Sequence, residues 1–166
     1  DKPVCYLTTA SAKAGVLLSP AMLRSGAVLV DLGAGVTGVA AFYRDALRYE
    51  ISIPFGSDTI TSDIKTAFCI APEDAEYLKR NAGIISEADV KKMYDIELPS
   101  GKTIPLDGTF YNFVVKARVE EIAAYISAAI AEAQRRGCRD MKVFLTGGGS
   151  RLKGLDEVLA DKLGLS

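Results

Sequence analysis

The sequence has 166 residues, of which 49% are hydrophobic and 25% are charged, and this predicts one compact domain or two small ones with a real core. The net charge of -1 gives no overall basic surface, so we expect no nucleic acid partner. Histidine is absent, which excludes Ser-His-Asp and Cys-His nucleophilic sites and removes the commonest metal ligand.

The first third of the chain predicts a three-stranded antiparallel meander. A strand-sized apolar run at 4–7 and a weak helical pattern over 10–18 come before it. Apolar and β-branched residues then form three runs joined by short turns, over residues 27–31, 36–43 and 47–53. The third run alternates, which predicts that one face carries Leu47, Tyr49, Ile51 and Ile53.

Helices dominate the rest of the chain. The pattern predicts, in chain order, helices over 58–68 and 73–81, a further helical turn within 86–93, a hairpin of 96–98 with 103–106, a long amphipathic helix over 110–136, a strand over 141–145 and a last helix over 152–163. Pro72 at the start of the second helix and Gly83 after its end are typical boundary residues.

The cysteines indicate a reducing compartment. Cys5, Cys69 and Cys138 are far apart and form no CxxC pair, so we expect neither zinc nor disulfides, a cytoplasmic setting, and a buried side chain at each position. The first residues show no basic segment followed by an apolar one, so no signal peptide is expected. No apolar run approaches the roughly 20 residues that a membrane-spanning helix needs.

Asp31 ends the first strand of the meander, and a glycine-rich turn, Gly33-Ala34-Gly35, follows it. Glycines accept positive φ and let the backbone approach a ligand closely, so successive N–H groups can hold an anion. A carboxylate beside a phosphate is repulsive unless a divalent cation or its water shell lies between them. The turn is therefore a candidate phosphate site, and a tight hairpin with a solvated Asp31 is the equally simple alternative.

A second glycine turn, Gly147-Gly148-Gly149-Ser150, lies between the strand at 141–145 and the last helix. A strand, a glycine turn and a helix N-terminus form a common setting for nucleotide contacts. The turn is neither a P-loop nor a GxGxxG fingerprint, and an ordinary strand–helix turn remains the alternative. A nucleotide needs a site for its phosphates and a site for its base, and the two turns together can supply both.

Glu76 and Lys79 are three residues apart on the helix over 73–81, so they share one face. A solvated ion pair is the simplest interpretation of this spacing.

The two turns carry a resemblance to a known superfamily. Asp31-x-Gly33-x-Gly35-Val36-Thr37 resembles the second phosphate loop of actin, Hsp70 and sugar kinases, and Leu145-x-Gly147-Gly148-x-Ser150 resembles their adenosine motif. Their order and separation are those of the C-terminal half of such proteins. Four segments are similar to the FtsA family of bacterial cell-division proteins, namely residues 47–56, 60–64, 74–79 and 145–155.

The resemblance extends over about residues 4–165 and implies an α/β fold, actin-like (RNase H-like), that forms half of an ATPase domain. Residues 1–56 with 110–166 would form an RNase H-like subdomain, IIA, and residues 57–109 a small inserted α+β subdomain, IIB. The first phosphate loop, the residue that positions water and an amphipathic membrane helix would lie outside this chain. We therefore assign no catalytic residue, and expect at most slow ATP hydrolysis and an inactive chain in isolation.

The resemblance also implies the ligands, ATP and Mg²⁺. The phosphates would lie on Gly33, Ala34, Gly35, Val36 and Thr37, and Asp31 would hold Mg²⁺ through water. Adenosine would be held by Glu76, Lys79, Gly147, Gly148, Gly149 and Ser150. The expected function is a polymerising protein that links FtsZ filaments to the cytoplasmic face of the inner membrane, with the FtsZ C-terminal tail docked on the small subdomain.

Two positions depart from the family pattern. FtsA usually has a second Thr and a closing Asp where this chain has Val36 and Gly38, and a missing carboxylate at position 38 weakens the expected organisation of a metal ion. An actin-fold adaptor of the PilM type in pilus assembly, or another ATPase of the actin and Hsp70 superfamily, are the alternatives.

Overall fold

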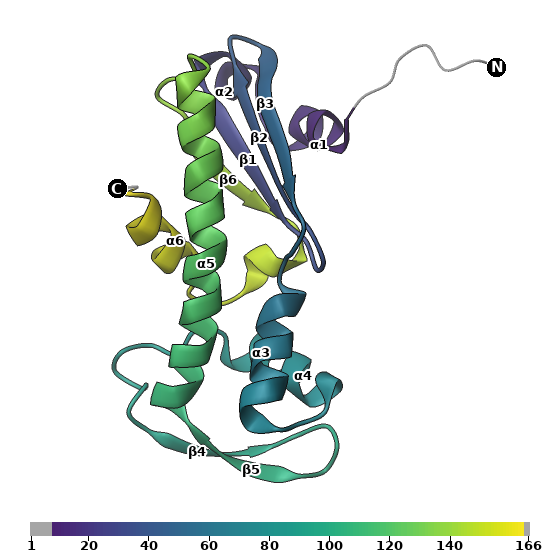
Figure 1. Cartoon of the computed structure of the whole chain (residues 1–166), viewed down its shortest axis with the longest axis vertical. Helices are drawn as coiled ribbons and strands as arrows, with labels where there is room; N and C mark the ends of the chain where they lie inside the picture. Colours follow the sequence, from purple (N-terminus) through teal and green to yellow (C-terminus); the bar gives the residue numbers. More distant parts are fainter. Residues whose placement is uncertain (1–7, 165–166) are drawn as a thin grey trace, which may run out of the picture.

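The computed structural model describes residues 8–164 and shows an elongated α/β molecule (Figure 1). A four-stranded sheet lies at one end, a two-stranded hairpin lies at the other, and one long helix extends along both. The run at 4–7 lies outside the described residues. The helix expected over 10–18 is confirmed as α1 (Thr9–Leu17), and a short helix that was not expected, α2 (Pro20–Ser25), follows it.

The predicted meander and the strand expected over 141–145 are confirmed. β1 (Ala27–Leu32), β2 (Thr37–Tyr43) and β3 (Ala46–Ile53) pair in antiparallel fashion, and β6 (Lys142–Thr146) pairs parallel to β1. The strand order is β3-β2-β1-β6, so β1 and β2 are the inner strands. β1 is buried along nearly all of its length, which explains why its sequence is a continuous apolar run and not an alternating one.

A β-bulge changes the face on which the start of β3 lies. Ala41 pairs with Tyr49 while its neighbour Phe42 pairs with Leu47, so Arg48 has no opposite residue. Each residue of a strand alternates between faces, and one extra residue therefore reverses the alternation. The prediction that Leu47 shares a face with Tyr49 is wrong, because Leu47 packs in the cluster beneath α1 and Tyr49 packs against the other cluster.

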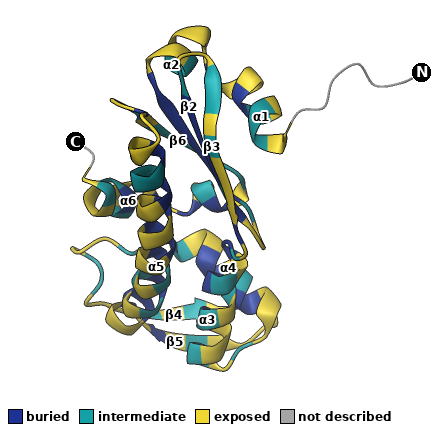
Figure 2. Ribbon diagram, turned by 45° about the horizontal axis from the view of Figure 1, so that its top comes forward, coloured by how far each residue is buried: buried dark blue, intermediate teal, exposed yellow. Residues whose placement is uncertain are grey.

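Helices cover both faces of the sheet (Figures 1 and 2). Val28 and Val30 of β1 belong to the large core cluster that includes the apolar side of the long helix α5 (Gly108–Arg135). Ala27 and Leu29, on the other face, belong to a smaller cluster with residues of α1. This two-sided burial fixes the end of β1, where Asp31 and the first glycine turn lie.

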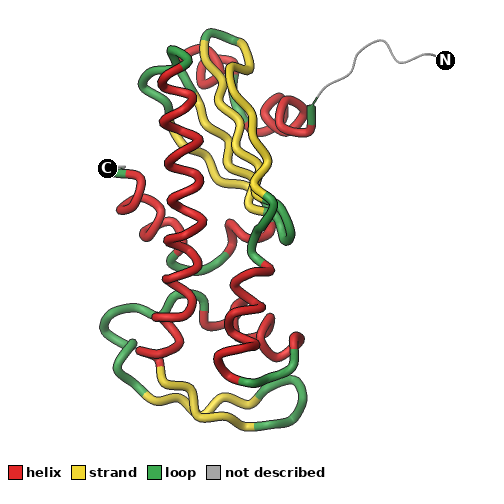
Figure 3. Tube along the Cα trace, viewed as in Figure 1, coloured by secondary structure: helices red, strands yellow, loops and turns green. Residues whose placement is uncertain are grey.

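The far end of the molecule is a small α+β unit (Figure 3). It consists of α3 (Asp58–Phe68), α4 (Pro72–Ala82), β4 (Met93–Glu97) and β5 (Thr103–Asp107). The helical turn expected within 86–93 is present as a single turn, in which the Val90 N–H donates to the Ser86 carbonyl at 2.9 Å, and β4 follows it. The long helix begins at Gly108, earlier than predicted, because the Asp107 carboxylate accepts the N–H of Thr109 at 2.8 Å and caps it.

One cluster of buried side chains reaches both ends of the molecule. It contains Val30 from the sheet, Ile64 from α3, Leu106 from β5 and Val119 from α5. The division into residues 1–56 with 110–166 and an inserted 57–109 remains a proposal, supported by the two separate sheets.

After β6, the chain forms a short 3-10 helix, η1 (Gly148–Arg151), and then α6 (Leu155–Leu163). The last helix therefore begins three residues later than predicted, because Gly154 takes a left-handed conformation with φ 77°. Cys138 is buried as expected, but the expectation for Cys69 is wrong because this thiol is exposed beyond the end of α3. Within residues 8–164, no helix combines the length and the apolar character needed to cross a bilayer.

Candidate functional site

The β1–β2 turn leaves several backbone N–H groups open. The Gly33 N–H donates to the carbonyl oxygens of Asp31 at 3.1 Å and Val36 at 3.0 Å, which closes the turn. The N–H groups of Ala34, Gly35 and Val36 have no hydrogen-bond partner among residues 8–164, and these three residues are exposed. Successive open N–H groups in a tight turn form a concave surface that suits an anion.

The first turn of α3 holds the carbonyl side of the same turn. The N–H groups of Ser57 and Asp58 donate to the carbonyls of Gly33 and Ala34, both at 2.9 Å. A Cβ at Gly56 would lie 2.5 Å from the Ala34 carbonyl oxygen, so only glycine permits this approach. The carbonyl oxygens of the turn are thus bound to α3, while the N–H groups of residues 34–36 remain available to a ligand.

Thr37 belongs to the same support. Its side chain is fully buried, and its hydroxyl donates to the Phe55 carbonyl at 2.9 Å. Thr37 therefore joins β2 to the segment that leads into α3, in a position where the side chain itself is not open to a ligand.

The second glycine turn packs directly on the end of β1. Gly147 has φ 88° and ψ 168°, a region that essentially only glycine occupies. A Cβ there would overlap the Leu32 carbonyl and lie 2.8 Å from Asp31 Oδ1. The N–H groups of Gly148 and Gly149 have no partner in the described part of the chain, and the Ser150 hydroxyl donates to the Gly147 carbonyl at 2.7 Å. The two turns are therefore neighbours in space.

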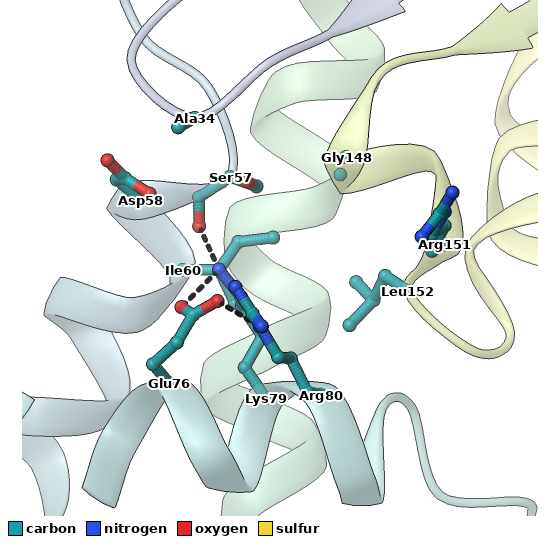
Figure 4. A pocket seen from close by; sticks show the side chains of 11 residues that line it. Ala34, Ser57, Asp58, Ile60, Glu76, Lys79, Arg80, Gly148, Arg151 and Leu152 are labelled. Carbon is teal, nitrogen blue, oxygen red and sulfur yellow. Dashed lines mark hydrogen bonds and ion pairs between the residues drawn. The ribbon is translucent and has the colours of Figure 1, made fainter. Parts of the chain in front are cut away.

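A cavity of about 440 Å³ lies between the two turns and α4 (Figure 4). Its volume is in the range of small-molecule sites. It brings together residues that are more than 100 positions apart, and its lining comprises Ala34, Ser57, Asp58, Ile60, Glu76, Lys79, Arg80, Gly148, Gly149, Arg151 and Leu152.

A charged network forms the floor of this cavity. Lys79 is 7% exposed, and its Nζ contacts the Ser57 carbonyl at 3.2 Å, Thr61 Oγ1 at 2.8 Å and Glu76 Oε2 at 2.6 Å. The Thr61 hydroxyl donates to Glu76 at 2.6 Å, and Arg80 pairs with the other carboxylate oxygen at 2.7 Å. An ammonium has three donors, so the Lys79 group is saturated by these partners and would need to leave one of them to contact a base.

The network keeps Glu76 ionised. Partial burial raises the pKa of Glu76, but hydrogen bonds from Lys79, Thr61 and Arg80 together outweigh that effect and lower it from 4.5 to about 2. Glu76 is therefore an anion across the physiological range, with a carboxylate fit to accept hydrogen bonds from hydroxyl groups.

Two cationic residues of the cavity were missed by the sequence reasoning. Arg80 lies one turn after Glu76 on α4, and Arg151 follows the second glycine turn. The i, i+4 spacing from Glu76 marks Arg80 as a neighbour, but no local pattern distinguishes Arg151 from a surface charge.

A second cavity, also of about 440 Å³, opens on the other side of the β1–β2 turn. It is lined by Lys13 of α1, Asp31, residues 33–36, Gly38 and Glu50 of β3, among others. The Lys13 ammonium and the Asp31 carboxylate form an ion pair there. Of the predicted phosphate residues, Ala34 lines both cavities, residues 33, 35 and 36 line only the second, and Thr37 lines neither. Asp31 lines only the second cavity.

The fold places the chain in the class of proteins with the actin-like ATPase fold. The chain matches the crystal structure of MreB5 of Spiroplasma citri bound to AMPPNP with a TM-score of 0.72 and 19% identity, over 94% of this chain and 50% of that chain. It matches the PilM–PilN type IV pilus biogenesis complex with a TM-score of 0.65 and 19% identity, over 87% of this chain and 35% of that chain. At such identities the likeness shows the fold alone.

The chain belongs to the FtsA family. The family model described as "Cell division protein FtsA" matches residues 28–166. The cell division protein FtsA of Escherichia coli K12 is 30% identical over 140 residues, which cover 78% of this chain and 33% of that protein. The chain thus spans about a third of the length of its curated relatives, and the family assignment favours FtsA over a PilM-type adaptor.

Proposed function

We propose that this chain forms one wall of the nucleotide site of an FtsA-family protein that binds ATP. The observation that carries the proposal is the cavity that unites Ala34, Gly148, Gly149 and Glu76. Open N–H groups on both glycine turns suit phosphate and ribose oxygens, and the Glu76 carboxylate suits ribose hydroxyls. MreB5, which has the same fold, has been solved with AMPPNP bound, and this supports nucleotide binding by a protein of this fold.

Mg²⁺ fits the site as an ion carried by the nucleotide. Mg²⁺ commonly keeps several waters and takes one or two carboxylates together with substrate phosphates. Asp31 is the carboxylate next to the phosphate turn, and residues 8–164 contain no group of three or more His, Cys, Asp or Glu side chains that could hold an ion by themselves. Asp31 would orient the water shell of an ion that the nucleotide brings with it.

The finer roles follow from family membership and remain part of the proposal. The full-length protein would polymerise, bind the C-terminal tail of FtsZ and link FtsZ filaments to the cytoplasmic face of the inner membrane. Nucleotide would control subunit geometry rather than rapid turnover.

Isothermal titration of ATP with Mg²⁺ into the full-length protein tests the nucleotide site. A Cβ at Gly148 would meet no atom within 4 Å, so Gly148→Glu places a carboxylate in the cavity without a steric clash in the fold. We expect an affinity loss of about 10- to 100-fold from the like charge beside the nucleotide. Ala124→Glu, on the exposed side of α5, is the matched control and should bind as the unmodified protein does. Unchanged affinity in Gly148→Glu would rule out this cavity.

A pull-down with a peptide of the FtsZ C-terminal tail tests the cell-division role. Retention of the full-length protein on that peptide, but not on a scrambled one, is the expected result. Failure to bind would favour the alternative, an actin-fold adaptor of the PilM type.

A further inference from the structure

We propose that Lys13 is a built-in counter-ion of the phosphate site, so that nucleotide binding by this protein depends only weakly on Mg²⁺. This inference rests on the proposed function and concerns the second cavity, beside Asp31.

Lys13 lies beside Asp31 because of how α1 packs. α1 packs on the face of the sheet where the side chain of Asp31 emerges, and it brings the Lys13 ammonium into an ion pair with that carboxylate. The two side chains are 39% and 27% exposed, so both are open enough for a ligand to reach them. Lys13 and the phosphate turn line the same cavity.

The strand opposite Asp31 carries no second carboxylate. Gly38 lies directly across from Asp31 in the β1–β2 register, and a Cβ at Gly38 would lie 3.7 Å from the Asp31 Cβ. An aspartate at position 38 would therefore put a second carboxylate beside the first, an arrangement that favours a divalent cation. This chain has no side chain there, and it has a lysine on the other side of Asp31.

Lys13 and the missing carboxylate at position 38 both reduce the negative charge around the phosphate turn. A lone carboxylate next to the open N–H groups of residues 34–36 would repel a phosphate, and a cation must cancel it. Lys13 already supplies one positive charge from within the fold. The ammonium therefore does at Asp31 what an outer-sphere Mg²⁺ would otherwise do, with no metal needed to make the turn acceptable to an anion.

The test is a titration of the full-length protein with a fluorescent ATP analogue in buffers with excess Mg²⁺ and with excess EDTA. For the unmodified protein we expect dissociation constants that differ less than about threefold between the buffers. Lys13→Met should weaken binding in EDTA by about 10- to 100-fold, with most of the loss recovered in Mg²⁺. Lys13→Arg, which keeps the charge, should bind in EDTA close to the unmodified protein.

A double variant separates neutralisation of Asp31 from a purely structural effect of Lys13. In Lys13→Met with Asp31→Asn, the repulsive carboxylate is gone and binding in EDTA should return to within about threefold of the unmodified value. Gly38→Asp adds a second carboxylate beside Asp31 and should make nucleotide binding strongly dependent on Mg²⁺. Circular dichroism and melting curves check that each variant is folded.

Three results overturn the inference. One is an unmodified protein that binds the analogue only with Mg²⁺, which leaves the proposed function intact. The others are a Lys13→Met variant with unchanged binding in EDTA and a double variant that does not recover. No binding of the analogue in either buffer would instead contradict the proposed function, and this inference with it.

Discussion

The two glycine turns of the site resemble each other in sequence but are held in different ways. The β1–β2 turn is held by its carbonyl oxygens, which accept N–H groups of Ser57 and Asp58 at the start of α3. The β6–η1 turn is held by contact, because Gly147 fits against the Leu32 carbonyl with no space for a side chain. Both arrangements leave N–H groups free near one cavity. The comparison shows that a glycine run can be required for packing at one position and open to a ligand at the next.

Gly147→Ala should have the largest effect on folding. The added methyl group would overlap the Leu32 carbonyl and approach Asp31 Oδ1, and φ 88° is strained for any residue with a Cβ. We expect the free energy of unfolding to fall by about 2–5 kcal/mol, measured by urea denaturation. Gly148→Ala is the matched control, since its Cβ meets nothing within 4 Å, and it should change stability by less than about 0.5 kcal/mol. Equal losses in the two variants would remove the distinction drawn between neighbouring glycines.

Gly56→Ala tests how the β1–β2 turn is held. The new Cβ would lie 2.5 Å from the Ala34 carbonyl oxygen and push the start of α3 away from the turn. We expect a loss of about 1–3 kcal/mol and weaker nucleotide binding, because the turn loses its support from Ser57 and Asp58. Gly35→Ala, whose Cβ meets no atom within 4 Å, serves as the control in the denaturation assay. A stable Gly56→Ala with normal binding would show that α3 does not hold the turn.

Glu76→Gln should have the smallest effect, and the size of this effect depends on pH. The folded-state pKa of Glu76 is lowered from 4.5 to about 2, so its charge stabilises the fold fully above about pH 4.5 and loses that effect as the pH falls towards 2. The variant should therefore be less stable than the unmodified protein at pH 7, by about 1 kcal/mol, with the difference shrinking at low pH. Denaturation curves at several pH values measure this. A difference that stays constant with pH would mean that the carboxylate charge contributes nothing.

Much of this fold could be predicted, because the elements depend on local patterns. Alternation and apolar runs gave the meander, and Pro72 and Gly83 marked α4. Leu47 was misplaced because a β-bulge leaves no mark in hydrophobic spacing. Positive φ was one of the two reasons given for the glycines, and of the five site glycines only Gly147 has it. Gly33 is required for the other reason, because it permits a close approach to the Val36 carbonyl.

The site residues that were missed depend on tertiary placement. Lys13 lies in a helix with a weak pattern, and only the packing of α1 on the sheet brings it to Asp31. The sequence around Arg151 does not distinguish it from a surface arginine, and only the position of η1 in the fold brings it to the cavity. Similarly, the saturation of Lys79 could not be seen from its spacing to Glu76, because Ser57 and Thr61 come from another helix and the residue before it.

The length of α5 has a further consequence for how this chain unfolds. The helix has 28 residues, or about 42 Å, and it contributes side chains to the one core cluster that reaches both the sheet and the hairpin. Neither end can lose its packing without exposing apolar surface on this helix. The two ends should therefore melt together in a single cooperative transition, and amides near the middle of α5, around Val119 and Ile122, should be among the slowest to exchange with solvent.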